Sequence, residues 1–265
     1  MKGIRYYVNS ECGAITEIKT CYASLHSSKA HLHNEISIGI IEKGSCNLEV
    51  YNKNYFLEEK TILIIPNEII HKCSPTDLKN WSFKMIYINE EWLKNGFYKN
   101  SEIIFKYKKL EQNNYKKIID YFSKLGKSKL KIEQEIILFE ILMTINLYDN
   151  FNIIENKDNY TLKIEKIKKY IDNYYLENIG LSELVSISGV SKYYIIRKFE
   201  EIYGISPYKY INSKKSAHAK NLLITNSNIT DVAVIYGFYD QSHFNKIFKE
   251  YSGVTPFQYL KNLKK

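Results

Sequence analysis

The sequence of 265 residues contains few of the residues that break, cross-link or anchor a chain. It has 4 Pro and 11 Gly, too few for a low-complexity or collagen-like protein. It has no run of eighteen apolar residues, and its first residues lack the apolar stretch of a signal peptide. We therefore expect no membrane partner. Hydrophobic residues make up 45% of the chain, enough to bury a core, and the length favours two domains.

Cysteine is also scarce. The four cysteines, Cys12, Cys21, Cys46 and Cys73, are widely spaced and form no Cys-x-x-Cys pair. This spacing is not that of a zinc finger. A reduced, cytoplasmic chain fits it best.

Positive charge is concentrated in the C-terminal part. Residues 160–265 carry 16 Lys and Arg against 9 Asp and Glu, a net charge of +7, whereas residues 1–159 carry a net charge of +2. A basic half is typical of proteins that bind a polyanion, but it also fits a lysine-rich solvated surface. Charge alone leaves both interpretations open.

Sequence patterning divides the chain into four parts. Residues 1–95 alternate short runs of β-branched and aromatic residues with turn signals, which predicts a β-sandwich or barrel. Residues 96–150 are expected to form a helical arm for packing or dimerisation. Residues 151–161 are polar and aperiodic, and we expect a linker there. Residues 162–265 have helical periodicity interrupted by glycines, which predicts an all-α domain.

Within the arm, apolar residues recur at three- and four-residue steps over residues 115–125 and 132–148. The second of these helices is apolar over more than half of its girth. It is therefore expected to pack against the β domain, a partner subunit, or both.

The C-terminal part contains an internal repeat. Four residues recur after 49 positions: Phe199, Gly204, Pro207 and Tyr210 return as Phe248, Gly253, Pro256 and Tyr259. Gly189 returns 48 positions later as Gly237. Each unit has an apolar helix, a glycine that tolerates positive φ, and a second helix, which is the pattern of a helix-turn-helix. One such pattern is a weak signal, but two in register predict a pair of helix-turn-helix units.

The second helix of each unit is expected to expose a polar stripe, which a repeat used only for packing would lack. Arg and Lys can donate to guanine, Asn and Gln can pair with adenine, and apolar groups can touch the thymine methyl. Residues 208–224 predict one helix of about 25 Å, long enough to place the two stripes about one DNA turn, roughly 34 Å, apart. The candidate DNA-contacting residues are Lys192, Tyr193, Ile196, Arg197, Gln241, Ser242, Asn245 and Lys246.

Residues 164–259 resemble the DNA-binding domain of the AraC/XylS family of bacterial transcription regulators, and residues 229–256 resemble its signature almost end to end. The resemblance implies base contacts from both recognition helices, double-stranded promoter DNA and RNA polymerase as partners, and activation as the usual sign. We expect the helical arm to form a homodimer. Two positions depart from the family: Ile196 replaces a residue that is often polar, and Lys215 stands where Arg is usual.

Three histidines mark the β domain. His31 and His33 share one face of a strand because side chains alternate, and His71 follows another strand. The segment 31–71 resembles a cupin barrel, as found at the N-terminus of sugar-sensing AraC members. Metal-binding cupins also carry a carboxylate four or five residues after the second histidine, where this sequence has Ser37 and Ile38. The metal set is incomplete, so no metal is expected.

Other interpretations of the histidines remain open. Glu35 can replace the missing carboxylate only if the strand stays regular through Asn34. The histidines can also be hydrogen-bonded residues of the barrel. We expect them to line a pocket for a small polar effector, because small β-barrels commonly enclose one ligand. Trp81 is a candidate to stack on that ligand or to fill the core.

The sequence thus predicts a cupin-like β-barrel with a helical arm, followed by an all-α domain with two helix-turn-helix motifs. The expected function is a cytoplasmic, effector-sensing, sequence-specific DNA-binding transcriptional regulator, with activation favoured. The alternative is a metal-dependent cupin enzyme with a nucleic-acid-binding tether. No phosphate loop, nucleophile elbow or pair of catalytic carboxylates is evident, so we expect neither catalytic residues nor a cofactor.

Overall fold

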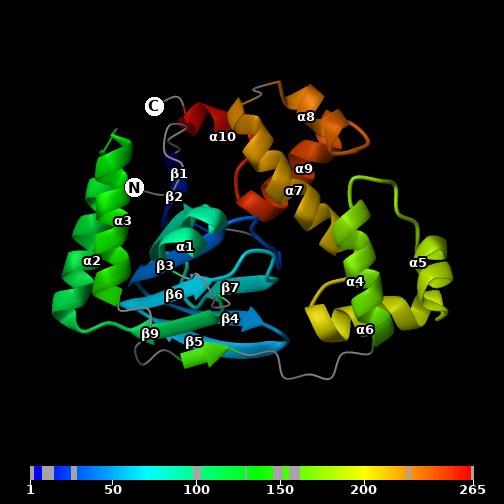
Figure 1. Ribbon diagram of the computed structural model, residues 1–265, viewed down its shortest axis with the longest axis horizontal. Helices are drawn as coiled ribbons and strands as arrows, with labels where there is room; N and C mark the ends of the chain where they lie inside the picture. Colours follow the sequence, from blue (N-terminus) through cyan, green and yellow to red (C-terminus); the bar gives the residue numbers. More distant parts are fainter. Residues whose placement is uncertain are drawn as a thin grey trace.

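A computed structural model describes residues 3–7, 15–24, 29–97, 103–128, 130–145, 152–154, 162–225 and 228–263. It contains an N-terminal β domain, flanked on one side by α2 and α3, and a C-terminal helical domain on the other side (Figure 1). The predicted mixed fold class is confirmed.

The β domain consists of two antiparallel sheets. The larger has the strand order β1-β2-β8-β3-β6-β9-β10, and the smaller has the order β5-β4-β7. The sheets do not close into one barrel along described strands; an isolated bridge between His31 and His71 lies outside them. The strands are β1 (Gly3–Tyr7), β2 (Ile15–Tyr22), β3 (Ile36–Lys43), β4 (Ser45–Val50), β5 (Lys53–Glu58), β6 (Thr61–Ile65), β7 (His71–Pro75), β8 (Ser82–Ile88), β9 (Phe105–Lys109) and β10 (Asn152–Ile154).

The larger sheet is buried on both faces, which explains the continuous apolar runs in its central strands. Along β6, Ile62 and Ile64 pack in the core that contains the arm helices, whereas Leu63 and Ile65 pack against the smaller sheet. The period of two sends alternate side chains to opposite faces. The sheet therefore separates two apolar layers.

This sheet extends beyond the expected boundary at residue 95. β9 pairs with β6, and β10, inside the expected linker, pairs with β9. Phe105 is buried, but four of the five residues of β9 are Lys or Tyr, and this composition hides the strand from apolar pattern analysis. A short helix, α1 (Glu90–Phe97), precedes it. Residues 155–161 of the expected linker lie outside the described residues.

The two predicted arm helices are α2 (Gln112–Leu125) and α3 (Lys131–Ile145). One face of α3, with Leu138, Ile141 and Ile145, packs into the core formed with the larger sheet. The remaining apolar residues are exposed by about half or more: Leu130, Ile132, Ile136, Phe139 and Met143. The β domain thus covers only one side of this apolar helix.

The C-terminal domain confirms the repeat. Its helices are α4 (Leu162–Tyr174), α5 (Leu181–Ser188), α6 (Lys192–Tyr203), α7 (Pro207–Thr225), α8 (Ile229–Ile235), α9 (Gln241–Ser252) and α10 (Pro256–Leu263). The pairs α5–α6 and α8–α9 form the two helix-turn-helix units, and α7 joins them. Gly189 and Gly237 adopt positive φ values of 68° and 63°, as the turns require.

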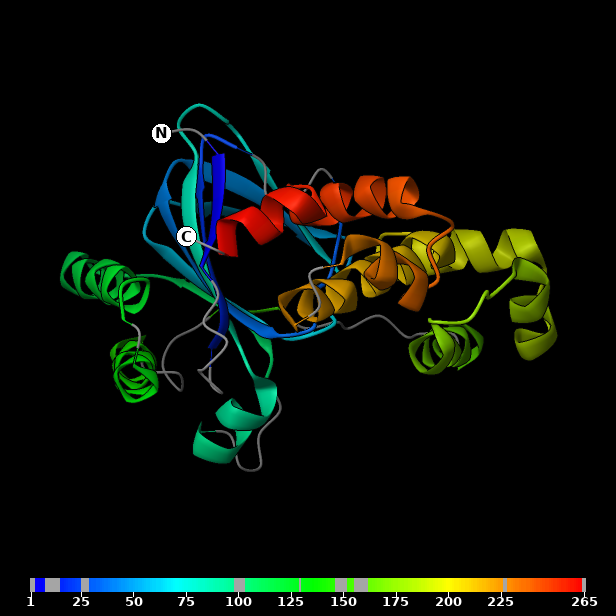
Figure 2. The ribbon, with the colours of Figure 1, turned by 90° about the horizontal axis from the view of Figure 1, so that it is seen from above.

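The β domain contributes one side chain to the core of each helix-turn-helix unit. Tyr6 of β1 is buried among residues of α7 to α10, and Leu32 is buried among residues of α4 to α7. In Figure 2, α10 (red) lies alongside the N-terminal strands (dark blue), in agreement with the contacts between α10 and β1. The two domains therefore share parts of their cores.

Two glycines with left-handed backbone give a matched test of the fold. Gly44 has φ of 79°, and an added Cβ would lie 2.4 Å from the backbone oxygen of Asn80; Gly189 has φ of 68° and no atom within 4 Å of an added Cβ. Gly189→Ala should lower the free energy of unfolding by about 1–2 kcal/mol, the cost of left-handed backbone. Gly44→Ala should cost clearly more because it adds a backbone clash. Denaturant unfolding of both variants measures the difference, and equal losses would contradict the packing at Gly44.

Candidate functional site

The two recognition helices, α6 and α9, are fixed by caps and by buried inner faces. The hydroxyl of Ser191 accepts a hydrogen bond from the backbone N–H of Tyr194 at 3.3 Å, and Asp240 accepts one from that of His243 at 2.6 Å. Both bonds satisfy donors that a helix N-terminus leaves open. Phe199 of α6 and Phe248 of α9, related by the repeat, are fully buried.

The predicted DNA-contacting residues lie on the outer faces of these helices. Ile196 and Asn245 are partly buried. Gln241 is held by its neighbour helix, because its side-chain oxygen accepts a hydrogen bond from Thr230 Oγ1 at 2.9 Å. The exposed members of the set are Lys192, Tyr193, Arg197, Gln241, Ser242 and Lys246.

Sequence reasoning missed one exposed aromatic residue beside α9. Tyr239, two residues before the helix, has 92% of its surface exposed. A chain with 24 Tyr gives little reason to single out one of them. The signal available was its place in the turn of the second unit.

Helix α7 is anchored to the second helix-turn-helix turn. Lys215 Nζ donates a hydrogen bond to the carbonyl oxygen of Gly237 at 3.4 Å. At the position where the resembling family usually has Arg, this chain therefore makes a backbone contact.

A buried carboxylate joins the β domain to the second helix-turn-helix unit. Glu17 of β2 has 1% of its surface exposed. It accepts hydrogen bonds from Lys220 Nζ of α7 at 2.8 Å and from the hydroxyl of Tyr259 of α10 at 2.7 Å. Beside it, the Tyr6 hydroxyl donates to the backbone oxygen of Ser252 at 2.5 Å. Every partner of Glu17 named here comes from the other domain.

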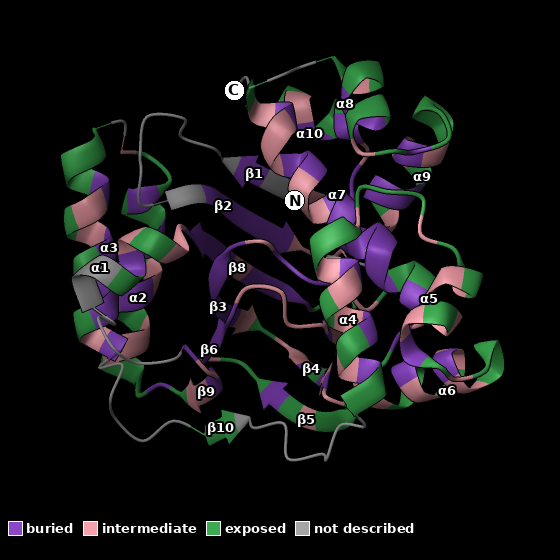
Figure 3. Ribbon diagram, turned by 45° about the vertical axis from the view of Figure 1, so that its right-hand side comes forward, coloured by how far each residue is buried: buried purple, intermediate pink, exposed green. Residues whose placement is uncertain are grey.

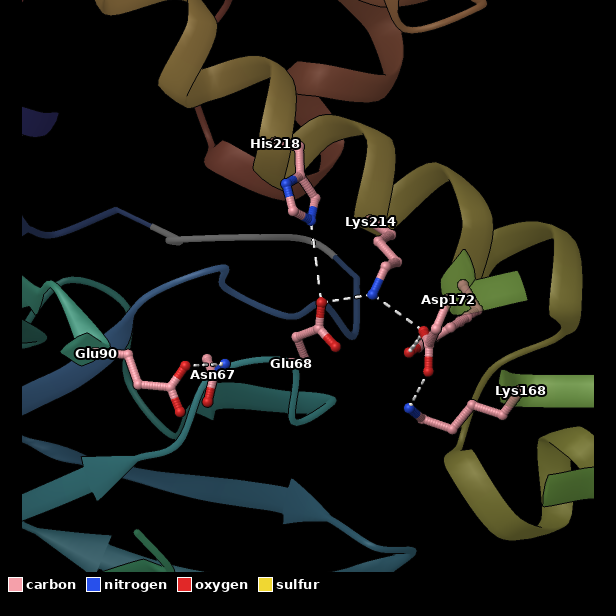
Figure 4. Close-up of polar contacts among 8 residues, drawn as sticks. Asn67, Glu68, Glu90, Lys168, Asp172, Lys214 and His218 are labelled. Carbon is pink, nitrogen blue, oxygen red and sulfur yellow. Dashed lines mark hydrogen bonds and ion pairs between the residues drawn. The ribbon is translucent and has the colours of Figure 1, made fainter. Parts of the chain in front are cut away.

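A second contact joins the β domain to the first unit (Figure 4). Lys214 Nζ of α7 lies between two carboxylates, 2.5 Å from Glu68 and 3.0 Å from Asp172 of α4. Near it, the backbone N–H of Leu32 donates to Ser213 Oγ at 3.1 Å. Residues 213 and 214 of α7 thus hold the segments that carry the histidines.

The structure brings the three predicted histidines together. Ring centroids are 4.6 Å apart for His31 and His71, 4.9 Å for His31 and His33, and 5.0 Å for His33 and His71. All three are buried, and burial holds the pKa of each imidazole below its usual value, to about 4 for His71. Glu35 is not part of the group; its carboxyl instead interacts with Lys220 and Asn221.

Two hollows lie near these histidines. Between the sheets, a cavity of about 30 Å³ is lined by His31, His71, Trp81 and otherwise apolar or thiol side chains. Trp81 is itself buried in the core. A cleft of about 250 Å³ lies between the domains, beside residues 68–70 of the β domain and Lys168 and Lys169 of α4. Sequence reasoning did not find this cleft, because it forms only where the domains meet.

No helix among the described residues has both the length and the apolar character needed to cross a bilayer. Residues 16–115 match the AraC-like ligand binding domain, and residues 184–262 match a helix-turn-helix domain. Together the two matches cover well over half of the chain. The chain belongs to the AraC family of regulators.

Relatives agree with this assignment to the AraC family. An uncharacterized HTH-type transcriptional regulator of Bacillus subtilis, YbfI, is 24% identical over 80% of both chains. A Staphylococcus aureus regulator, SACOL0084, is 31% identical over 52% of this chain, although the match spans only 18% of that larger protein. The structure of ToxT from Vibrio cholerae covers 98% of this chain and 96% of its own, with a TM-score of 0.57 and 16% identity, which shows a shared fold.

The interface contains a lysine whose titration should be visible in stability. Burial lowers the pKa of Lys19 to about 7, whereas an unfolded lysine titrates near 10.4. Between these values the unfolded state binds more protons, so stability rises with pH. From pH 7 to pH 9, the wild type should gain about 1–3 kcal/mol relative to Lys19→Met. Unfolding curves at both pH values test this, with exposed Lys116→Met as the control; a constant difference between wild type and Lys19→Met would contradict it.

Proposed function

We propose that this chain reads promoter DNA through α6 and α9 and senses a small molecule through its β domain. One observation carries the proposal: the two helix-turn-helix units expose their polar faces while the β domain completes the core of each. A change in the β domain can thus alter how both units are held. This is a population shift, in which a ligand favours the arrangement that it binds better.

The DNA contacts are proposed residue by residue. Lys192, Arg197 and Lys246 supply positive charge and donors. Tyr193 and Ile196 present apolar surface to thymine methyl groups. Gln241, Ser242 and Asn245 supply hydrogen-bonding groups to base edges. Activation by contact with RNA polymerase, and a cytoplasmic location, are proposed from the family resemblance and the expected DNA target.

The effector is proposed to be small and polar. The interdomain cleft supports this, because Glu68, Lys168 and Lys169 give it charged walls. His31, His33, His71 and Trp81 remain proposed ligand-binding positions, although the cavity of about 30 Å³ beside them admits little more than a water-sized group. The turn at residues 68–70 borders the cleft and leads to His71. Structures of ToxT have been determined with an unsaturated fatty acid, so an acid with a larger apolar body is the contrasting effector class to test.

DNA contact predicts a specific loss in two variants. Arg197→Ala and Lys246→Ala should each weaken binding to the promoter site by roughly 1–3 kcal/mol and relax sequence preference at a few base pairs. Exposed Lys117→Ala on α2 is the control and should bind as the wild type does. Titrations at one fixed salt concentration, with random DNA as competitor, measure both effects, since phosphate contacts make affinity depend on salt. Unchanged affinity and footprint in both variants would contradict the assigned reading faces.

A homodimer through α3 is the proposed assembly. Ile132, Ile136, Phe139 and Met143 follow each other at steps of four, three and four residues, the spacing of a helix-pairing seam, and are exposed by 48–62%. A second copy of α3 supplies a matching apolar stripe.

Ile136→Glu should convert the proposed dimer to a monomer, because it places a charge in the apolar seam. Glu133→Gln, on the same helix, changes charge without removing an apolar contact and is the control. Sedimentation of both variants measures the assembly. A wild type that is monomeric at all concentrations, or an unaffected Ile136→Glu variant, would exclude this interface.

A further inference from the structure

The histidine cluster is built on a specific backbone pairing. His31 and His71 exchange two backbone hydrogen bonds, of 3.0 and 2.9 Å, so they stand directly opposite each other and their side chains share one face. His33 lies two residues further along and joins the same face. One ring nitrogen from each of the three lies within 4.8 Å of the others.

Backbone contacts fix the proton positions on two of the rings. The Nδ1 atoms of His31 and His71 lie 3.1 and 2.9 Å from the carbonyl oxygens of Lys29 and Ile69. A carbonyl oxygen only accepts, so each Nδ1 must donate its hydrogen. In a neutral imidazole this leaves the lone pair on Nε2. Metal-binding histidines are commonly oriented by such a bond to a carbonyl.

We propose that His31, His33 and His71 together bind one divalent transition-metal ion of the zinc class. Three imidazoles and no carboxylate suit zinc and its neighbours, whereas magnesium and calcium prefer oxygen ligands. A metal–nitrogen bond of about 2.0–2.1 Å places tetrahedral ligands roughly 3.3 Å apart. The rings therefore need to approach each other by no more than about 1.5 Å.

The surroundings fit an ion with one open coordination position. Three protein ligands leave a fourth position for water or a small ligand, and the adjoining cavity of about 30 Å³, lined by His31 and His71, has room for one. The sequence comparison rejected a metal because the four-ligand cupin set lacks its carboxylate. The geometry instead supports a three-histidine set, with Glu35 engaged elsewhere.

The position of the cluster links the ion to DNA binding; this second step rests on the proposed function. Leu32, between two of the ligands, donates its N–H to Ser213 of α7 and packs in the core of the first helix-turn-helix unit. Glu68, three residues before His71, pairs with Lys214 of α7. An ion that ties the two histidine segments together would restrain both contacts to α7.

Metal binding is tested on the full chain, stripped with a chelator and titrated with Zn²⁺ alone by calorimetry. One ion per chain should bind, and His33→Gln should weaken binding at least about 10–100-fold, the loss known for changes around metal sites. His243→Gln on α9 and the double variant Cys46→Ser, Cys73→Ser should retain wild-type affinity. Absence of binding, or loss in the cysteine variant with retention in His33→Gln, would overturn the site.

A second measurement covers the risk that His33→Gln disturbs folding. Zn²⁺ should raise the melting temperature of the wild type and of His243→Gln, because it binds the folded state, but not that of His33→Gln. Co²⁺ in place of Zn²⁺ should give the wild type an absorption spectrum of nitrogen-ligated, four- or five-coordinate cobalt. A spectrum with sulfur-to-cobalt charge transfer would assign the ion to the cysteines and overturn the proposal.

The link to DNA is tested separately. Zn²⁺ should change the affinity of the wild type for its promoter site, and Ser213→Ala should bind Zn²⁺ normally but show a smaller change. A wild type that binds Zn²⁺ at the histidines with unchanged DNA affinity would overturn the link. If no form of the protein prefers promoter DNA over random DNA, the proposed function fails while the metal result stands by itself.

Discussion

The Glu17 carboxylate is the constraint on which the arrangement of the two domains depends. It is almost fully buried, and it is compensated by Lys220 and Tyr259, both from the helical domain. Burying a charge is costly, and removing one partner of a buried ion pair typically costs about 3–5 kcal/mol because the other charge is left uncompensated. The β domain therefore cannot separate from the helical domain without hydrating this group.

The contacts of the β domain converge on α7. Ser213, Lys214 and Lys220 receive Leu32, Glu68 and Glu17 in turn. Much of α7 is buried in Figure 3, including polar residues that a two-unit DNA-binding domain by itself would leave exposed. Because α7 also joins the two helix-turn-helix units, a shift of this helix changes the spacing of α6 and α9. The sensor thus acts on the element that sets the DNA register.

Local and repeating features were predictable from the sequence. The 49-residue repeat fixed both helix-turn-helix units, because glycine turns, caps and apolar faces agree at each position. Alternation predicted that His31 and His33 share a face. β9 was not predicted, because its lysines mask the alternation, and its strand character depends on pairing with β6. The pairing of Glu17 with Lys220, 203 residues apart, has no local signature, and the cleft beside Glu68 exists only when both domains are in place.

The two apolar faces of α3 show a further limit of sequence reasoning. The apolar excess predicted packing against the β domain, a partner, or both, and only the structure separates Leu138 and Ile141, which are buried, from Ile136 and Met143, which are exposed. The buried face belongs to the fold of one chain. The exposed face is available for assembly.

Hydrogen–deuterium exchange of Glu17→Gln against the wild type tests the coupling of the domains most directly. The substitution removes the charge that compensates Lys220 while keeping the size of the side chain. We expect faster amide exchange across the domain boundary, in α7 and α10, as well as in β2. Faster exchange confined to the β domain, with α7 and α10 protected as in the wild type, would contradict the coupling.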